Sequence, residues 1–200
     1  PEPFMGLRPN LISIVRSGST QSGQVVNFEA LCASPEHSLQ VISPHGIQVG
    51  ISCLGTTRKA AGSRTGLFRV DHDYVLAVAK GVRARGARQF ILVTAAWAGG
   101  PGFYLKTKGK IEHSVTALGF ERLDIIRPGL LIGERNSPRA GEEIGQRVSA
   151  LLAPLLFGPL ARFGAVSVQT VANAIVGLAG EIVPGRFVHE NDEIRRLGAG

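Results

Sequence analysis

Residues 103–127 read FYLKTKGKIEHSVTALGFERLDIIR, and this stretch predicts a helix that runs directly into a strand. Apolar residues recur at spacings of four and three at Ile111, Val115 and Leu118, which is the period of a helix with one buried face. A glycine then ends the helix, and residues 123–126 form a short apolar run typical of a strand. The rest of the chain is organised around this helix–strand unit.

Two reactive side chains lie near the start of that helix. Tyr104 and Lys108 are four residues apart, so the phenol and the ammonium group are expected on one face. A cation beside a phenol favours the phenolate and lowers the tyrosine pKa, and such a tyrosine can exchange a proton with a carbonyl or alcohol oxygen. The alternative is a chance pairing, which the spacing alone does not exclude.

The composition indicates a folded, basic protein. The 200 residues are enough for one domain with a hydrophobic core. Because 44% of the residues are hydrophobic and only 18% are charged, the composition is that of a folded chain and not of a disordered one. A formal charge of +7 suits a nucleic acid, a phosphorylated ligand or an anionic surface. Because Lys and Arg are scattered, with no more than two in a row, and aromatic residues are few, we expect no nucleic-acid partner.

Cysteine usage and hydropathy argue against a metal site and a membrane span. Cys32 and Cys53 form no C-x-x-C motif or Cys/His cluster, so no metal site is expected. Their simplest interpretation is two buried thiols in a reducing compartment. The most apolar run, residues 148–160, is interrupted by prolines and a glycine and is too short to cross a bilayer. No signal peptide is visible, so the sequence predicts a cytoplasmic protein.

The order of the predicted elements indicates an open α/β sheet. From residue 49 onward strands and helices alternate, and each connection is long enough for a parallel crossover. We therefore expect a parallel sheet with helices on both faces. Strands are predicted at residues 10–15, 24–28, 49–54, 89–94 and 123–126, helices at 29–33, 71–85 and 103–118, and irregular or loop structure at 34–44, 57–68 and 95–102.

The pattern changes after residue 127. We expect the tail, mainly residues 130–200, to form a small C-terminal helical cap on the substrate side of the same domain. Its predicted elements are a helix at 142–156, a helix at 168–178 capped by Ser167, a short strand at 187–188 and a polar helix at 191–197.

Ligands of such sheets bind beyond the carboxyl ends of the strands. Structural alternatives exist for some residues there, since Arg127 also fits an ion pair with an acidic neighbour and Arg16 a solvated strand end. Thr56 and Thr57 also fit plain turn positions. The candidates at this edge are Arg16, Gly55, Thr56, Thr57, Thr94, Arg127 and Pro128, together with Tyr104 and Lys108.

Four motifs occur in order along the chain: CLGTTRKAAG at 53–62, VDHDYVLAVAK at 70–80, FYLKTKGKIE at 103–112 and DIIRPGLLIGER at 124–135. Together they resemble the atypical short-chain dehydrogenase/reductase family, and in particular its Tat-interacting-protein-like NAD(P)H-binding oxidoreductase branch. The likeness covers residues 10–197. It implies a Rossmann-like doubly wound parallel sheet, a single NAD(P)-binding domain over residues 1–200, and NADP or NAD as cofactor.

The resemblance implies catalytic roles for three residues. Tyr104 would be the general acid and base, and Lys108 would hold the nicotinamide ribose and lower the tyrosine pKa. Thr94 matches the catalytic hydroxyl, because it is the only hydroxyl in VTAAWA. Many relatives carry a serine pair there, whereas this chain continues with Ala95.

Further positions match the cofactor contacts of the family. Arg16 matches the residue that often faces the adenosine 2′-phosphate. Asn27 and Phe28 match the spot beside the adenine, where relatives often have Asp. The loop that flanks the cofactor matches Leu54, Gly55, Thr56 and Thr57. The turn beside the nicotinamide matches Arg127 and Pro128.

One part of the family pattern is missing. The family opens with a strand and a G-x-x-G-x-x-G turn at a helix N-terminus, which binds the pyrophosphate, and these 200 residues contain no such motif. The first predicted strand aligns with the second strand of the family. A central strand would therefore be absent between residues 10–15 and 49–54, leaving unpaired edges. Since the chain starts at Pro1 and its only methionine is Met5, we expect further residues upstream.

Three functions are compatible with the sequence. The first is an NAD(P)H-dependent oxidoreductase that transfers a hydride to a small carbonyl with Tyr104 as proton donor. It would bind a dinucleotide and a small-molecule substrate, and a homodimer is compatible with it. The second is a non-catalytic nucleotide-sensing or protein-interaction module, favoured by Ala95 and by the missing glycine-rich turn. A nucleotide-sugar epimerase-like enzyme is the third, and the short tail argues against it.

Overall fold

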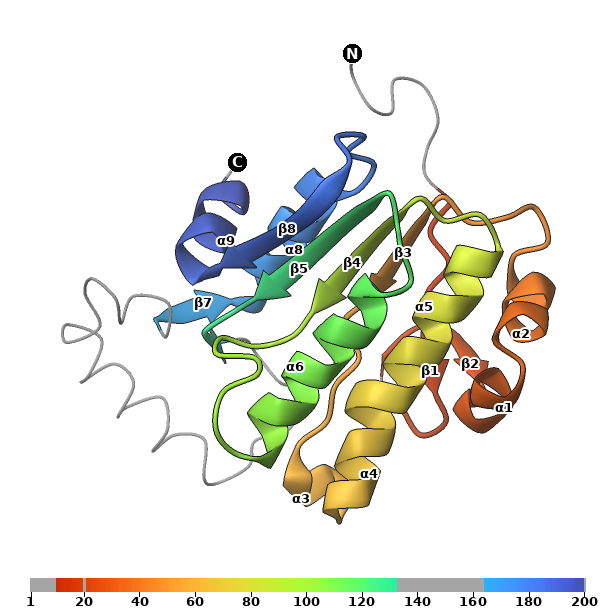
Figure 1. The fold of residues 1–200 in the computed structure, drawn as a ribbon, viewed down its shortest axis with the longest axis horizontal. Coiled ribbons are helices and arrows are strands. Elements are labelled where there is room, and N and C mark those ends of the chain that lie inside the picture. The colour runs from red at the N-terminus through yellow and green to blue at the C-terminus, as the bar shows by residue number, and fades with distance from the viewer. Residues whose placement is uncertain (1–9, 20, 133–163, 200) are drawn as a thin grey trace.

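The computed structural model describes residues 10–19, 21–132 and 164–199. Its main sheet has four parallel strands in the order β3-β4-β5-β8 (Figure 1). These strands are β3 (Val49–Ser52), β4 (Gln89–Val93), β5 (Arg122–Arg127) and β8 (Gly185–Glu190).

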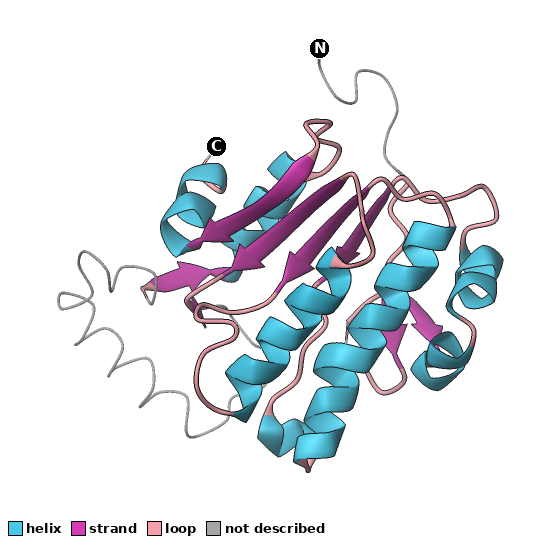
Figure 2. Cartoon of the chain, viewed as in Figure 1, coloured by secondary structure: helices cyan, strands magenta, loops and turns pink. Residues whose placement is uncertain are grey.

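Helices cover both faces of this sheet (Figure 2). Phe90 and Ile125 pack into a core cluster with α5 (Val75–Ala84) and α6 (Phe103–Thr116). Ile91 and Ile126, one residue further along the strands, point to the opposite face. There they pack against α8 (Val168–Leu178) and α9 (Asn191–Leu197). The predicted α/β class, with a parallel sheet between helical layers, is confirmed.

The predicted face of α6 is the buried one. Ile111 and Val115 are 1% and 0% exposed, and Leu118 packs at the border of the same cluster. The helix is followed by Gly119, whose φ of +68° is the left-handed conformation that glycine adopts at helix ends. The chain then enters β5, so the helix–strand unit is confirmed.

The stretch before α5 is more helical than the sequence predicts. Residues 57–68 were expected as a loop, but they form α3 (Arg58–Ala61) and α4 (Arg64–Phe68). Each helix is capped by a hydroxyl, because Thr57 accepts from the Ala60 N–H and Ser63 from the Gly66 N–H. A π-helical turn, η1 (Arg69–Tyr74), continues directly into α5. Asp71 therefore lies inside a helical run and does not begin one.

The N-terminal part also contains an additional helix. Residues 34–44 were expected to be irregular, but α2 (Pro35–Ile42) begins with a proline, which suits the first helical position because its missing N–H has no partner there. It packs closely on α5 at Gly81, where an added Cβ would lie 2.7 Å from a Leu39 methyl group. Before it, α1 (Phe28–Ala33) begins at the residue where a strand was predicted to end.

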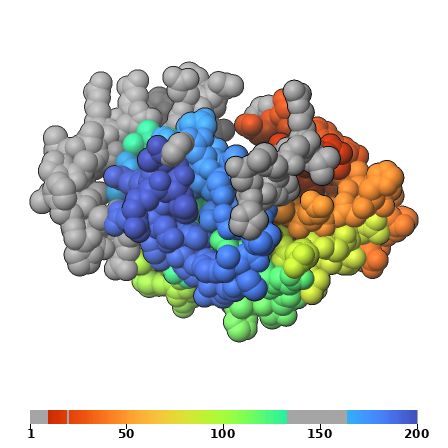
Figure 3. All heavy atoms as spheres, turned by 90° about the horizontal axis from the view of Figure 1, so that it is seen from above, coloured from red at the N-terminus to blue at the C-terminus, as the bar shows by residue number. Residues whose placement is uncertain are grey.

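The first two strands do not join the main sheet. Strand β1 (Ile14–Arg16) pairs in parallel with β2 (Gln24–Val26) in a separate two-stranded sheet. From above, this part (red) lies on the other side of the molecule from α9 (dark blue, Figure 3). No described strand pairs with the outer edge of β3, so β3 ends the main sheet at the place where the sequence predicts a missing strand.

The C-terminal elements complete the sandwich. Ser167 caps α8 as predicted, by accepting a hydrogen bond from the Thr170 N–H. The expected strand at 187–188 is the centre of the longer β8, which pairs with β5. The expected helical cap is present as α8 and α9, and it packs directly on the sheet. A small unpredicted sheet forms from β6 (Leu130–Ile132) and β7 (Ala165–Ser167), whereas the predicted helix at 142–156 lies outside the described residues.

Within the described ranges, no helix has the length and apolar character that crossing a bilayer requires. The expectation of two buried thiols is wrong, because Cys53 is exposed and Cys32 is only half-buried. Both thiols are free.

Candidate functional site

The start of α6 brings Tyr104 and Lys108 together, as their spacing predicts. The Lys108 Nζ lies 5.6 Å from the centre of the Tyr104 ring. Their surroundings differ, because Tyr104 is 41% exposed and Lys108 only 4%. The tyrosine can therefore meet a ligand from solvent, whereas the lysine works from inside the protein.

A buried aspartate that the sequence did not single out as a site residue holds Lys108 in place. Asp71, on η1, is 1% exposed, and its Oδ1 lies 2.7 Å from the Lys108 Nζ. Its Oδ2 accepts a hydrogen bond of 2.8 Å from the Thr56 N–H. Asp71 thus links α6 to the loop after β3. Nothing in the sequence separates Asp71 from Asp73 two residues later, since only the π-turn decides which of them faces inward.

The loop after β3 passes close to this ion pair. A Cβ added at Gly55 would lie 3.5 Å from the Lys108 Nζ and 3.6 Å from the Asp71 Oδ1, which is ordinary contact, so the glycine lies directly against the pair. Leu54 packs against the core, and Thr57 serves as the cap of α3. For Thr57 the structural alternative, a turn or cap residue, is the observed one.

The pKa of Tyr104 is raised, first by burial and then by the negative charge of Asp71. The sequence led us to expect the opposite shift, caused by Lys108. That expectation is wrong because burial disfavours the phenolate, and the carboxylate of Asp71, 2.7 Å from the Lys108 ammonium group, adds to this effect.

Thr94 belongs to a second buried network. Its hydroxyl donates to Glu112 Oε1 at 2.7 Å, and Glu112 also accepts from Arg127 through Nε at 3.0 Å and Nη2 at 2.6 Å. Arg127 in turn donates to Glu190 at 3.2 Å. The alternative interpretation of Arg127, an ion pair with an acidic neighbour, is therefore observed. Glu112 was missed, although it lies one helical turn after Lys108.

The remaining predicted positions serve the fold with their side chains, except Arg16, which is exposed at the end of β1. The Asn27 side chain caps α1 by accepting from the N–H groups of Glu29 and Ala30. Phe28 is buried, with its ring 5.2 Å from that of Tyr74. Pro128 is buried, and its carbonyl accepts from the Ala96 N–H at 2.9 Å. The structure therefore brings together Tyr104, Lys108 and the turn at 55–56. The Thr94–Arg127 network lies at the ends of β4 and β5. Asn27 and Phe28 act in the cap of α1 and in the core.

A hollow of about 390 Å³ opens where β5 and β8 end. Its wall includes Trp97, which has a φ of +63°, an uncommon conformation for a residue other than glycine. Such backbone strain persists only where the surrounding structure imposes it. The lining residues are Trp97, Ala98, Gly100, Pro101, Arg127 and Glu190.

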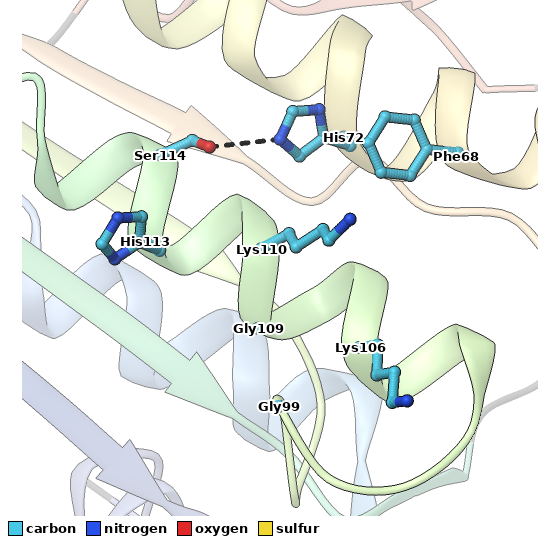
Figure 4. A pocket seen from close by; sticks show the side chains of 8 residues that line it. All are labelled: Phe68, His72, Gly99, Lys106, Gly109, Lys110, His113 and Ser114. Carbon is cyan, nitrogen blue, oxygen red and sulfur yellow. Dashed lines mark hydrogen bonds between the residues drawn. The ribbon is translucent and has the colours of Figure 1, made fainter.

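A second hollow lies along α6 and contains none of the predicted site residues (Figure 4). Lys106 and Lys110 project from α6 beside it, and the His72 ring is hydrogen-bonded to the Ser114 hydroxyl at 3.1 Å. Its lining is basic and partly aromatic, in keeping with the net charge of the chain. It is formed by Phe68, His72, Gly99, Lys106, Gly109, Lys110, His113 and Ser114.

Curated proteins of similar sequence indicate the family to which this chain belongs. Protein HTATIP2 of Rattus norvegicus is 39% identical over 160 residues, which cover 76% of this chain and 62% of that protein. The chain belongs to the atypical short-chain dehydrogenase/reductase family, in its HTATIP2-like branch. Protein FMP52, mitochondrial, of Eremothecium gossypii is 42% identical over 116 residues, or 57% of this chain and 51% of that protein. The chain thus spans less than two thirds of these curated relatives, and no family model matches it.

Solved structures agree in fold. A short-chain type dehydrogenase/reductase from Mycobacterium ulcerans superposes with a TM-score of 0.56 at 18% identity, covering 85% of this chain and 67% of that one. The Bordetella bronchiseptica enzyme WbmG, in complex with NAD, superposes with a TM-score of 0.55 at 11% identity, covering 84% of this chain and 57% of that one. At such identities the likeness concerns the fold alone.

The predicted cytoplasmic localisation is contradicted by these relatives. FMP52 proteins from several fungi, among them Eremothecium gossypii and Saccharomyces cerevisiae, are named as mitochondrial. The prediction rested on the lack of a visible signal peptide in these 200 residues, which span only part of the length of the relatives.

Proposed function

We propose that this chain belongs to an NAD(P)H-dependent oxidoreductase that reduces a small carbonyl compound. The observation that carries this proposal is the Tyr104/Lys108 pair on α6, with the lysine buried against the turn at Gly55 and Thr56. In parallel α/β sheets this edge is where ligands bind. Membership of the short-chain dehydrogenase/reductase family supports the same function.

The residues present suit one end of a dinucleotide. Gly55 leaves its turn open to close approach beside Lys108, which would hold the nicotinamide ribose. The cofactor, when bound, supplies a hydride to the carbonyl carbon. Tyr104 would donate its phenolic proton to the carbonyl oxygen, and the hollow beside Trp97 and Arg127 would hold the rest of the substrate.

For the adenosine end, Arg16 is the proposed selector of NADP over NAD. Its guanidinium lies at the carboxyl end of β1 and is exposed, so it is available for charge-assisted hydrogen bonds to a 2′-phosphate. WbmG, with the same fold, is described in complex with NAD, which supports dinucleotide binding and leaves the choice between NAD and NADP to the Arg16 test.

A second candidate function has a specific observation in its favour. Thr94 is only 6% exposed and its hydroxyl already donates to Glu112, and Ala95 offers no second hydroxyl. A non-catalytic nucleotide-sensing or protein-interaction module would tolerate this arrangement, whereas a reductase would have to polarise the carbonyl through Tyr104 alone.

The two candidates are separated by replacing one phenol at a time. Tyr104→Phe keeps the ring packing and removes the proton donor, so we expect NADPH-dependent carbonyl reduction to be lost while the circular dichroism spectrum is unchanged. Tyr74→Phe is the matched control, because Tyr74 is the other tyrosine of the chain and its hydroxyl binds Glu29. Turnover that survives in Tyr104→Phe would remove Tyr104 from the mechanism.

A further inference from the structure

Among the residues that the structure describes, the charged groups around Tyr104 come from few elements. Lys108 is one turn further along α6, and Asp71 of η1 lies against that lysine. The loops at 55–57 and 94–102 contain no charged side chain. From α4, Arg64 lies over the neighbouring Phe103 ring at 5.7 Å. Of the described charges, those of Asp71 and Lys108 therefore act most directly on the phenol.

This pair is built into the fold. The side chains of Lys108 and Asp71 are 5% and 0% exposed, and the second carboxylate oxygen of Asp71 is tied to the Thr56 N–H. A lone ammonium group would draw a nearby phenol toward its ionised form, whereas a lysine that is already paired with a carboxylate attracts the phenolate much less.

We propose that Asp71 sets the direction in which Tyr104 moves its proton: by neutralising Lys108 it keeps the phenol protonated, so that the residue is a proton donor and a poor base. The proposal rests on the proposed function of Tyr104 and deepens it. Asp71 acts through Lys108 and is thus a positioning residue. The raised pKa of Tyr104, caused by burial and by Asp71, agrees with this assignment.

The direction follows from the balance of the reaction. In reduction, a C–H bond forms as hydride reaches the carbonyl carbon, the dihydronicotinamide is oxidised, and the Tyr104 O–H bond breaks as its proton moves to the carbonyl oxygen. Water then returns a proton to the phenolate. Alcohol oxidation requires the phenolate at the start, and this is the form that the Asp71 charge disfavours.

The test uses the fact that the chain has only two tyrosines. In a Tyr74→Phe background, the ultraviolet absorbance of tyrosinate reports the ionisation of Tyr104 alone, with no cofactor or turnover. We expect Tyr104 to ionise at a higher pH in the folded protein than in the same protein denatured by urea. Adding Asp71→Asn, which keeps the side-chain shape, should move this ionisation to lower pH.

Asp73→Asn is the matched control, because it removes a carboxylate two residues away that pairs with Arg69 and not with Lys108. It should leave the Tyr104 titration unchanged. A folded-state ionisation at or below that of the denatured protein, or equal shifts in Asp71→Asn and Asp73→Asn, would overturn the proposal.

Two features keep the outcome decisive. If Asp71→Asn does not fold, Asp71→Ser takes its place and should likewise lower the pH at which Tyr104 ionises, because the comparison of folded with denatured Tyr74→Phe protein also contains the effect of burial. Activity against pH, assayed separately in both directions, tests the proposed function. An expected titration without any turnover would refute the reductase and leave the role of Asp71 at the phenol standing.

Discussion

Gly109 lies in the middle of α6, and replacing it by alanine should destabilise the protein although alanine is the better helix former. A Cβ at this position would lie 2.5 Å from the Gly99 Cα and 2.7 Å from the Gly99 backbone N. Both are main-chain atoms, so no side-chain rotation can relieve the overlap. Gly99 is itself anchored, because its N–H donates to the Leu105 carbonyl at 2.7 Å.

Two opposing effects decide whether Gly109→Ala raises or lowers the free energy of unfolding. Gly→Ala in a helix interior gains up to about 1 kcal/mol from helix propensity. Overpacking of a close contact costs about 1–3 kcal/mol, and contact with rigid backbone favours the upper part of that range. We therefore expect Gly109→Ala to lower the free energy of unfolding by about 1–2 kcal/mol.

Gly177→Ala is the control, because Gly177 lies in α8 with no atom within 4 Å of an added Cβ. It should stabilise the protein by about 0.5–1 kcal/mol. Urea unfolding followed by circular dichroism measures both variants, with the slope m checked for constancy. If Gly109→Ala proved as stabilising as Gly177→Ala, the contact between α6 and the loop at Gly99 would be refuted.

Three further expectations follow from the site and its surroundings. Arg16→Ala should weaken binding of NADPH more than binding of NADH, and equal losses in fluorescence titrations would show that Arg16 does not read the 2′-phosphate. The 200-residue chain should bind NADPH weakly, since it has no glycine-rich turn for the pyrophosphate, and micromolar binding by titration would contradict this. Burial favours the neutral His189 ring, but hydrogen bonds to the carboxylates of Asp124 and Glu193 outweigh it and raise its pKa above 6.5. The stabilising effect of His189 should thus be full below pH 6.5 and fade as pH rises through the folded-state pKa, so that wild type and His189→Gln converge in urea unfolding at alkaline pH.

The parts of the fold predicted from sequence are those with a strong local signal. Strand β4 is apolar from Phe90 onward, and α6 shows a clear helical period through Ile111 and Val115, and these residues are buried as expected. The short helices α3 and α4 were missed because glycines at 62 and 66 suggested a loop, whereas the capping hydroxyls of Thr57 and Ser63 were the better signal.

The site was harder to predict because its key contacts join residues far apart in sequence. Tyr104 and Lys108 could be predicted together from one helical turn. Asp71 reaches Lys108 from 37 positions earlier (108 − 71), and a charged residue in a helix normally points to solvent. The raised pKa of Tyr104 follows from its burial and from the Asp71 charge, and both depend on tertiary packing that no local sequence pattern shows.

The open side of β3 has a consequence for handling these 200 residues in solution. In a parallel ladder alternate residues bond to opposite neighbours, so half of the β3 amide groups have no strand partner among the described residues. The strand reads Val-Gly-Ile-Ser and lacks the lysine or proline that commonly protects such borders, and Ile51 is 37% exposed. Those amide protons should exchange quickly with deuterium, whereas the β3 amide protons that are bonded to β4 should stay protected. Concentrated samples should tend to aggregate through this strand.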